Sequence, residues 1–312
     1  MSKIAFVFPG QGAQSVGMAR DVYEASADAK ALFDTADQVL GMDLTNLIFE
    51  GPAEELKQTA NTQPALLTAS VALLQAVNKQ GIKADYVAGH SLGEYSALAA
   101  AGVLSFEDAV SIVRLRGQFM EAAVPSGQGA MAAVLGAERG KLTELCAEIS
   151  AEGTVVEPAN MNCPGQIVVS GSAEGVAALS ARVKDIGAKR AIALEVSGPF
   201  HSSMMKEAAE KLGEHLSSLT FNDSEIPVVA NVTARPVSGA ENVKESLIRQ
   251  VYSPVLWEDS VQWLIGEGVD TFIEIGPGNV LAGLIKKIDK SVRIFSVNSL
   301  ESAEALTSEL NE

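Results

Sequence analysis

The 312-residue sequence has few cysteines, few histidines and no long apolar run, and each scarcity excludes a class of protein. Its two cysteines, Cys146 and Cys163, are too few for a disulfide framework and lack the spacing of a metal site. No apolar stretch reaches the roughly 18 residues of a membrane span, and the run at 4–8 is too short for a signal peptide. We therefore expect a cytoplasmic chain with no membrane association, no bound metal and no bound cofactor.

Positive charge is also scarce, because 23 lysines and arginines face 39 aspartates and glutamates, which leaves a formal net charge of −16. No basic stripe is present, which argues against nucleic acid as a partner. The glycine-rich residues 10–15 lack the third glycine of a dinucleotide fingerprint and a Walker lysine, so no nucleotide site is expected. The remaining composition, 47% hydrophobic and 20% charged, is that of a globular chain with one large or two modest domains.

The most informative motif is Gly89-His90-Ser91-Leu92-Gly93, a Gly-x-Ser-x-Gly sequence. The apolar residues before it predict a buried strand, and the Ala- and Leu-rich residues after it predict a helix. In that context the motif forms a turn so sharp that the residues two before and two after the serine must be small. The turn exposes the Ser91 hydroxyl next to helix N–H groups that stabilise an oxyanion. We predict a nucleophilic serine, with a plain strand–helix turn as the alternative.

The predicted pattern of helices and strands changes near residue 127. Before that point we expect a strand at 4–8 and helices at 21–40, at 64–80 and from a capping signal at Ser105 to about residue 123. Residues 127–197 show the order β-α-β-β-α-β of a ferredoxin-like unit, with its last strand at 190–196. After Pro199 an α/β pattern resumes. We therefore predict an α/β fold in which a mostly parallel domain, 1-126 and 198-312, is interrupted by a ferredoxin-like subdomain, 127-197.

A serine hydroxyl needs a base, and the sequence offers three histidines. His90 adjoins Ser91 but points away from it in most elbow geometries, and His215 lies in a polar helical stretch that predicts a solvated position. His201 follows a predicted strand in a loop, where catalytic groups of α/β sheets gather. By elimination, His201 is predicted as the base. No acidic third member stands out, which leaves a backbone or side-chain carbonyl to orient the imidazole.

Arg116 lies in the middle of a predicted helix on a face that should be buried. Its neighbours three and four residues away are all apolar: Ile112, Val113, Phe119 and Met120. A buried guanidinium is costly unless an anion meets it, and its planar fork suits a carboxylate. We predict a clamp for a substrate carboxylate, with a structural ion pair or a snorkelling side chain as the alternative. Arg114, in contrast, is predicted at the surface.

Together these residues resemble a known family, the malonyl-CoA:acyl carrier protein transacylases of bacterial fatty acid synthesis. The resemblance covers essentially the whole chain. It includes the segments Phe8-Pro9-Gly10-Gln11-Gly12, Thr62-Gln63-Pro64-Ala65-Leu66, Gly89-His90-Ser91-Leu92-Gly93-Glu94-Tyr95, Arg116-Gly117, Asn160-Met161-Asn162-Cys163-Pro164-Gly165-Gln166, Gly198-Pro199-Phe200-His201, Arg249-Gln250 and Glu274-Ile275-Gly276-Pro277-Gly278. It implies a hydrolase-like core with a ferredoxin-like insert. Cys163 departs from the family pattern, in which a serine is common at this place.

The resemblance also implies the roles of the site residues. Ser91 is acylated, His201 is its base, and Arg116 binds the malonyl carboxylate. The backbone amides of Gln11 and Leu92 form the oxyanion hole, and Gln250 helps to hold the histidine. Relatives selective for methylmalonyl groups tend to carry Gln after the serine and Ser before the histidine. Leu92 and Phe200 occupy those places here, which favours malonyl.

These residues predict a ping-pong transfer of malonyl from malonyl-CoA to the phosphopantetheine thiol of acyl carrier protein. Carrier proteins are strongly acidic, so binding to this acidic chain needs a local basic patch. The candidates are Lys189, Arg190, Lys206, Lys286 and Lys287, with scattered solvated charge as the alternative. Two other functions stay open: a serine thioesterase or esterase that uses water as acceptor, and a non-catalytic carrier-protein-binding module.

Overall fold

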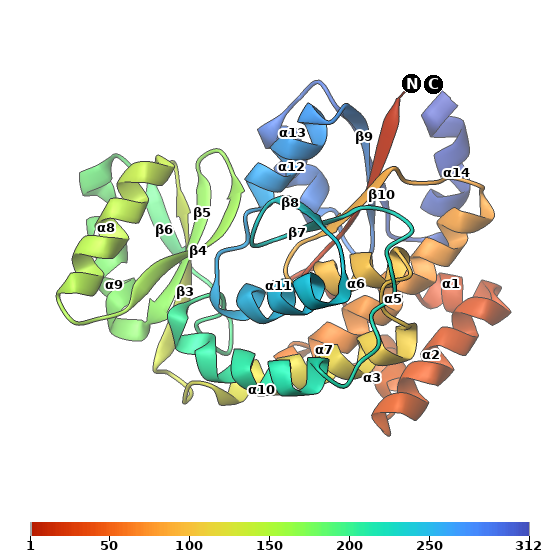
Figure 1. The fold of residues 1–312 in the computed structure, drawn as a ribbon, viewed down its shortest axis with the longest axis horizontal. Helices are drawn as coiled ribbons and strands as arrows, with labels where there is room; N and C mark the ends of the chain where they lie inside the picture. The colour runs from red at the N-terminus through yellow and green to blue at the C-terminus, as the bar shows by residue number, and fades with distance from the viewer. Residues whose placement is uncertain (1, 312) are drawn as a thin grey trace.

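A computed structural model describes residues 2–311 and contains two β-sheets flanked by helices (Figure 1). The larger sheet has six strands in the order β10-β9-β1-β2-β7-β8. Its strands are β1 (Lys3–Phe8), β2 (Tyr86–Gly89), β7 (Val228–Ala230), β8 (Arg235–Val237), β9 (Val269–Ile275) and β10 (Arg293–Val297). All neighbouring strands are parallel except β7 and β8. The predicted mostly parallel α/β core is confirmed.

The central strand β1 is apolar on both of its faces, as strands buried between two layers of helices are. Phe6 and Phe8 pack on one side with the helices α5 (Thr59–Lys79), α6 (Gly93–Ala100) and α7 (Phe106–Ala122). Ala5 and Val7 pack on the other side with α12 (Trp257–Gly266) and α13 (Val280–Ile288). β1 and β2 are parallel, and Phe8 at the end of β1 is in register with Gly89 at the end of β2. The loops that follow the two strands therefore leave the sheet next to each other.

The second sheet has four antiparallel strands in the order β4-β5-β3-β6. Its elements are β3 (Gly129–Leu135), α8 (Arg139–Ala151), β4 (Val156–Cys163), β5 (Gln166–Ser172), α9 (Ala173–Arg182), the 3₁₀ turn η1 (Val183–Ile186) and β6 (Arg190–Ala193). The chain order is thus β-α-β-β-α-β, with the first and third strands in the centre. The predicted ferredoxin-like order is confirmed. The last strand is shorter than predicted, because it ends at Ala193 rather than at Val196.

The two faces of this second sheet have different partners, because side chains alternate along a strand. Ala132 and Val134 face α8 and α9 within one hydrophobic cluster. Met131 and Ala133 face the opposite way, towards the larger sheet, and Ala133 and Val168 line a groove between the two sheets. The antiparallel unit therefore forms one wall of the site described below.

The remaining helices cover the larger sheet and its edges. They are α1 (Arg20–Ala25), α2 (Ala27–Leu40), α3 (Leu44–Glu50), α4 (Ala53–Leu56), the 3₁₀ turn η2 (Ser203–Met205), α10 (Lys206–Leu216), α11 (Ala240–Tyr252) and α14 (Leu300–Asn311). The single helix predicted at 21–40 is wrong. Ser26 breaks it with an extended backbone and caps α2 by accepting a hydrogen bond from the N–H of Ala29. Within residues 2–311, no helix is long and apolar enough to cross a membrane.

The helix predicted from residue 64 begins five residues earlier, at Thr59, and places Pro64 inside α5. Its first turn carries polar side chains that are nevertheless buried: Thr59, Asn61, Thr62 and Gln63. The helix predicted after Ser105 is confirmed, since the Ser105 side chain caps α7 by accepting from the N–H of Asp108.

We propose that the chain divides into the domain 1-126 and 198-312 and the subdomain 127-197. Support comes from a separate hydrophobic cluster, whose buried members all lie between Ala132 and Ala188.

Candidate active site

The elbow at residues 89–93 joins β2 to α6 through a turn with no room for larger residues. A Cβ on Gly89 would lie 1.9 Å from the carbonyl carbon of Gly93, and one on Gly93 would lie 2.1 Å from the carbonyl oxygen of Phe8. Ser91 itself has a φ of 52°, a left-handed conformation that is costly for a residue with a side chain. The prediction that both flanking positions must be small is confirmed. The turn lifts Ser91 clear of the sheet.

Asn231, which directly follows β7, braces this strained turn. Its Oδ1 accepts from the N–H of Ser91 at 2.8 Å, and its Nδ2 donates to the carbonyl of Gly89 at 2.7 Å. Asn231 is 1% exposed, so these hydrogen bonds satisfy backbone groups that would otherwise be buried without partners. The side chain thus stabilises both arms of the elbow.

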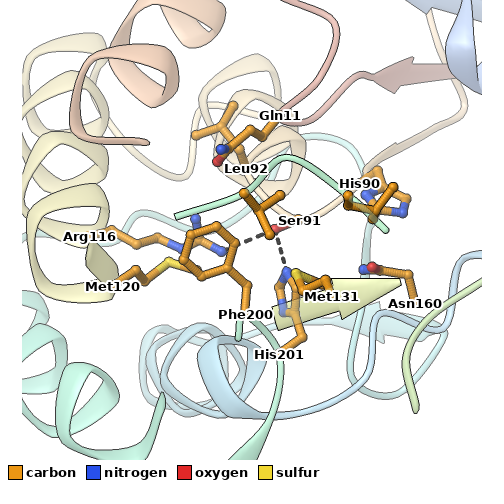
Figure 2. Close-up of a pocket in the computed structure, with 12 residues that line it drawn as sticks. Gln11, His90, Ser91, Leu92, Arg116, Met120, Met131, Asn160, Phe200 and His201 are labelled. Atoms are coloured by element: carbon orange, nitrogen blue, oxygen red, sulfur yellow. Dashed lines mark hydrogen bonds between the residues drawn. The ribbon is translucent and has the colours of Figure 1, made fainter. Parts of the chain in front are cut away.

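His201 reaches Ser91 from a turn that follows β6. Its backbone is also left-handed, with a φ of 59°, and its Nε2 lies 2.7 Å from the Ser91 Oγ (Figure 2). Its Nδ1 lies 2.7 Å from the backbone carbonyl oxygen of Gln250. A carbonyl only accepts, so Nδ1 carries the hydrogen and Nε2 is free to accept the serine proton. Burial, with Arg116 nearby, lowers the pKa of His201 to about 3, so the imidazole is neutral at pH 7.

Arg116 lies on the other side of the serine and is 1% exposed. Its Nη1 donates to Gln63 Oε1 at 2.8 Å, and its Nη2 donates to Gln250 Oε1 at 2.9 Å and to Ser91 Oγ at 3.2 Å. Its Nε has no hydrogen-bond partner among residues 2–311, and no ion pair in this range includes it. The guanidinium is therefore a buried cation, next to the serine, whose direct partners are neutral. The predicted burial is confirmed. Arg114, predicted at the surface, is only partly exposed and donates to Asn61.

Gln250 on α11 connects the three residues. Its carbonyl oxygen accepts from His201 and its side-chain oxygen accepts from Arg116, as given above. Its Nε2 donates to the carbonyl of Ser91 at 3.0 Å and to Glu94 Oε2 at 2.7 Å. Burial raises the pKa of Glu94 to about 7, against the opposing effects of hydrogen bonds from Asn231 and Gln250 and of the charge on Arg116.

Ser91, His201 and Arg116 line one cavity of about 110 Å³. Gln11, Leu92 and Phe200 line it as well, so these predicted site residues meet (Figure 2). Gln250 does not line the cavity but contacts both Arg116 and His201. The other lining residues are His90, Met120, Met131, Asn160, Leu194 and Val196. The backbone N–H groups of Gln11 and Leu92 make no hydrogen bond within residues 2–311. Two residues that line the cavity with Ser91 thus have backbone donors without a partner in this range.

The other two histidines lie outside this pair. His90 points away from the serine hydroxyl, and its Nε2 lies 2.8 Å from Asn162 Oδ1, while its ring packs near Trp257. His215 is exposed on α10 and packs on Phe119, which confirms the solvated position. The supporting residues Gln63, Glu94 and Asn231 were not predicted as site residues. Each is a buried polar side chain, but the sequence alone does not show that they are buried together.

A groove of about 280 Å³ adjoins this cavity and shares four residues with it: Gln11, His90, Asn160 and Leu194. Of the five basic residues predicted for a partner surface, all are exposed. Lys287 Nζ donates at 3.2 Å to Oε1 of Gln166, which lines the groove. Gln166 on β5 is in register with Leu135 on β3, which is in register with Arg190 on β6. Lys287 and Arg190 therefore lie at one edge of the groove, whereas Lys206 begins α10.

The fold and this site define an acyltransferase: the family model of the acyl transferase domain matches residues 5–307. The malonyl CoA-acyl carrier protein transacylase of Bacillus subtilis is 54% identical over 312 residues, which are 100% of this chain and 98% of that protein. Within the acyltransferases, the chain therefore belongs to the malonyl CoA-acyl carrier protein transacylase family, as the resemblance implied.

Solved structures agree with this assignment. An acyl carrier protein S-malonyltransferase from Vibrio cholerae superposes with a TM-score of 0.95 at 47% identity and covers 98% of this chain and 100% of its own. A malonyl-transacylase solved in complex with a type II PKS acyl-carrier protein superposes with a TM-score of 0.96 at 43% identity, over 99% of this chain and 100% of its own. The predicted fold class is confirmed by both.

Proposed function

We propose that the chain transfers the malonyl group of malonyl-CoA to the phosphopantetheine thiol of acyl carrier protein, through a malonyl ester on Ser91, and so supplies fatty acid synthesis. The observation that carries this proposal is the position of Arg116: a buried cation 3.2 Å from the Ser91 hydroxyl, without a carboxylate partner among residues 2–311. A substrate that brings its own carboxylate completes this site. A neutral acyl group leaves the cation uncompensated.

The first half-reaction forms the ester. Ser91 Oγ attacks the thioester carbonyl carbon while His201 Nε2 takes the hydroxyl proton. The N–H groups of Gln11 and Leu92 donate to the oxygen that becomes negative in the tetrahedral intermediate. The carbon–sulfur bond then breaks, and coenzyme A leaves as a thiol with the proton from His201. Arg116 holds the distal carboxylate throughout.

The second half-reaction runs the same steps in reverse with a new thiol. The phosphopantetheine thiol gives its proton to His201, and its sulfur attacks the ester carbonyl. The ester bond breaks, Ser91 recovers its proton from His201, and the malonyl thioester leaves. Water competes at this stage. The apolar side chains of Met120, Met131 and Phe200 line the cavity and limit that competition.

We further propose that the groove beside the cavity admits the pantetheine arm and that the basic residues at its edge bind the acidic carrier protein. The positions of Arg190 and Lys287 support this binding surface, and Lys189 and Lys286 adjoin them in the chain. None of the four forms an ion pair within residues 2–311, so their charges are available. Lys206 lies outside this edge and contributes only if the carrier protein extends to α10.

A two-stage transfer assay tests the function. The chain is incubated with malonyl-CoA, freed of small molecules, and then mixed with carrier protein that bears its phosphopantetheine arm. We expect one malonyl group on the chain after the first stage and on the carrier protein after the second, by intact mass. Free malonate in place of malonyl carrier protein would identify a hydrolase. An unmodified chain that has consumed no malonyl-CoA would identify a non-catalytic module.

A further inference from the structure

The N-terminal end of α5 carries two buried polar side chains that contact different residues lining the cavity. Thr59 and Gln63 are four residues apart, so they share one face of the helix. Thr59 is 0% exposed and Gln63 is 1% exposed. Gln63 accepts from Arg116, whereas Thr59 contacts Gln11. One helix end thus supports both the cation and the loop that carries an unpaired N–H group.

The Thr59 hydroxyl joins three separate segments of the chain. Its Oγ1 accepts from Gln11 Nε2 at 3.1 Å and lies 2.9 Å from Ser197 Oγ in the segment after β6. A hydroxyl has one donor and two acceptor sites, so it satisfies both contacts at once. Thr59 is itself held firmly, because its N–H donates to Glu121 at 2.6 Å and its carbonyl packs against Gly117 of α7.

The loop that holds Gln11 has few other attachments at this point. Within residues 2–311, the Gln11 side chain makes its hydrogen bond to Thr59 alone, and its backbone N–H makes none. The next residue, Gly12, has a φ of 104° and donates to Gln14 within the loop. The Gln11 backbone lies in a turn that the Ala13 N–H closes by donating to the Gly10 carbonyl at 3.4 Å. The direction of the Gln11 N–H therefore depends on this turn, on packing and on the one side-chain tether to Thr59.

We propose that Thr59 is a positioning residue for acyl transfer: its hydroxyl holds the Gln11 side chain so that the Gln11 backbone N–H stays directed at the thioester oxygen. This inference rests on the proposed function and adds to it a residue that never touches the substrate. A donor that meets the oxygen only as it becomes negative acts on the transition state rather than on substrate binding. Loss of the tether should therefore lower kcat and leave KM nearly unchanged.

The test replaces the hydroxyl with a methyl group of the same shape, Thr59→Val, and measures the single-turnover acylation of Ser91 by malonyl-CoA. We expect the maximal rate to fall by about 10- to 100-fold, since a misplaced oxyanion donor costs up to about that factor. The concentration of malonyl-CoA that gives half the maximal rate should change by less than about threefold. Thr59→Ser keeps the hydroxyl and should restore most of the rate.

Two matched variants separate this role from general packing. Thr68 lies on the same helix, is 0% exposed, and donates only to the Pro64 carbonyl, so Thr68→Val removes a buried hydroxyl away from the site. It should leave the acylation rate unchanged within about twofold. Ser197→Ala removes the other contact of Thr59, and the rate should also stay within about threefold. A loss in Ser197→Ala equal to that in Thr59→Val would show that the tether to Gln11 is not the cause.

The partner side of the bond gives a second test should Thr59→Val fail to fold. Gln11→Met keeps the backbone N–H but removes the tether, so it should lower the rate as Thr59→Val does. The double variant should be no slower than the slower single variant, because one bond is lost in all three. Multiplied losses, or an unchanged rate in Gln11→Met, would overturn the inference. A wild-type chain that forms no malonyl ester would instead refute the proposed function, and the inference with it.

Discussion

The backbone carbonyl oxygen of Gln250 accepts a hydrogen bond from Nδ1 of His201 at 2.7 Å, in the place where a serine–histidine–aspartate triad has a carboxylate. The carbonyl fixes the tautomer and the ring orientation as a carboxylate would, but it brings no negative charge. With Arg116 also close by, the site favours the neutral imidazole strongly. The side chain of the same glutamine accepts from Arg116, so one residue positions both His201 and Arg116.

The pH dependence of acylation should reflect this neutral imidazole. Because the pKa of His201 is lowered to about 3, the base stays unprotonated far below the usual 6.5. The rate of Ser91 acylation should therefore be flat between about pH 5 and pH 8. The measurement is best made in Glu94→Gln, because the pKa of the buried Glu94 carboxyl, about 7, lies within this range. An acid limb centred near pH 6.5 would contradict the assignment of His201.

Removal of the buried cation should change acyl selectivity. Arg116→Ala is expected to lower malonyl transfer by about 100-fold or more and to change acetyl transfer far less, since the acetyl group has no carboxylate to lose. The ratio of kcat/KM for malonyl-CoA and acetyl-CoA measures this. Arg114→Ala on the same helix is the control and should leave the ratio unchanged. Equal losses for both acyl groups would rule out the clamp.

The stability of the fold should depend on Glu94. Its pKa is about 7 in the folded chain and 4.5 otherwise, so between these values the folded state holds a proton that the unfolded state releases. Its contribution to stability is therefore present below pH 4.5 and is lost as the pH rises towards 7. Relative to wild type, Glu94→Gln should gain on the order of 3 kcal/mol in unfolding free energy from pH 4.5 to pH 8. Urea denaturation at both pH values measures the difference, and a pH-independent difference would contradict the burial of an ionisable Glu94.

Charge reversal at the groove edge should slow transfer to the carrier protein specifically. Arg190→Glu with Lys287→Glu is expected to reduce transfer from malonyl-Ser91 to the acidic protein by about tenfold at low salt. Transfer to a small uncharged pantetheine thiol should be unaffected. Lys141→Glu, an exposed reversal on α8, is the control. An unchanged rate to the carrier protein in the double variant would remove these two residues from the docking surface.

The elements with a local signal were predictable from the sequence, and the contacts between distant residues were not. The elbow needs glycines at fixed offsets, and Ser105 caps α7, so both are visible in a few adjacent residues. Arg116 was found because its helical neighbours are apolar. Thr59, Gln63 and Asn231 are polar side chains in ordinary segments, and only the packing of three elements at one point shows their use.

The missed elements follow the same rule. The strands at Arg235–Val237 and Arg293–Val297 are short and lie at the sheet edges, where the sequence shows little apolar alternation. Ser26 is a residue type that caps helices, but the apolar pattern of the residues on both sides continues across it, so the break was not predicted. The start of α5 was missed because a proline such as Pro64 is typical of the first turn of a helix. In the structure the helix begins at Thr59, where tertiary packing holds the residues that precede the proline.

We propose that acyl transfer passes through an ester on the Ser91 hydroxyl. Wild-type chain and Ser91→Ala are each mixed with malonyl-CoA, quenched within one turnover in acid, and weighed intact. We expect a single added malonyl group on the wild-type chain and none on the variant. A malonyl adduct on Ser91→Ala at the wild-type rate would contradict it.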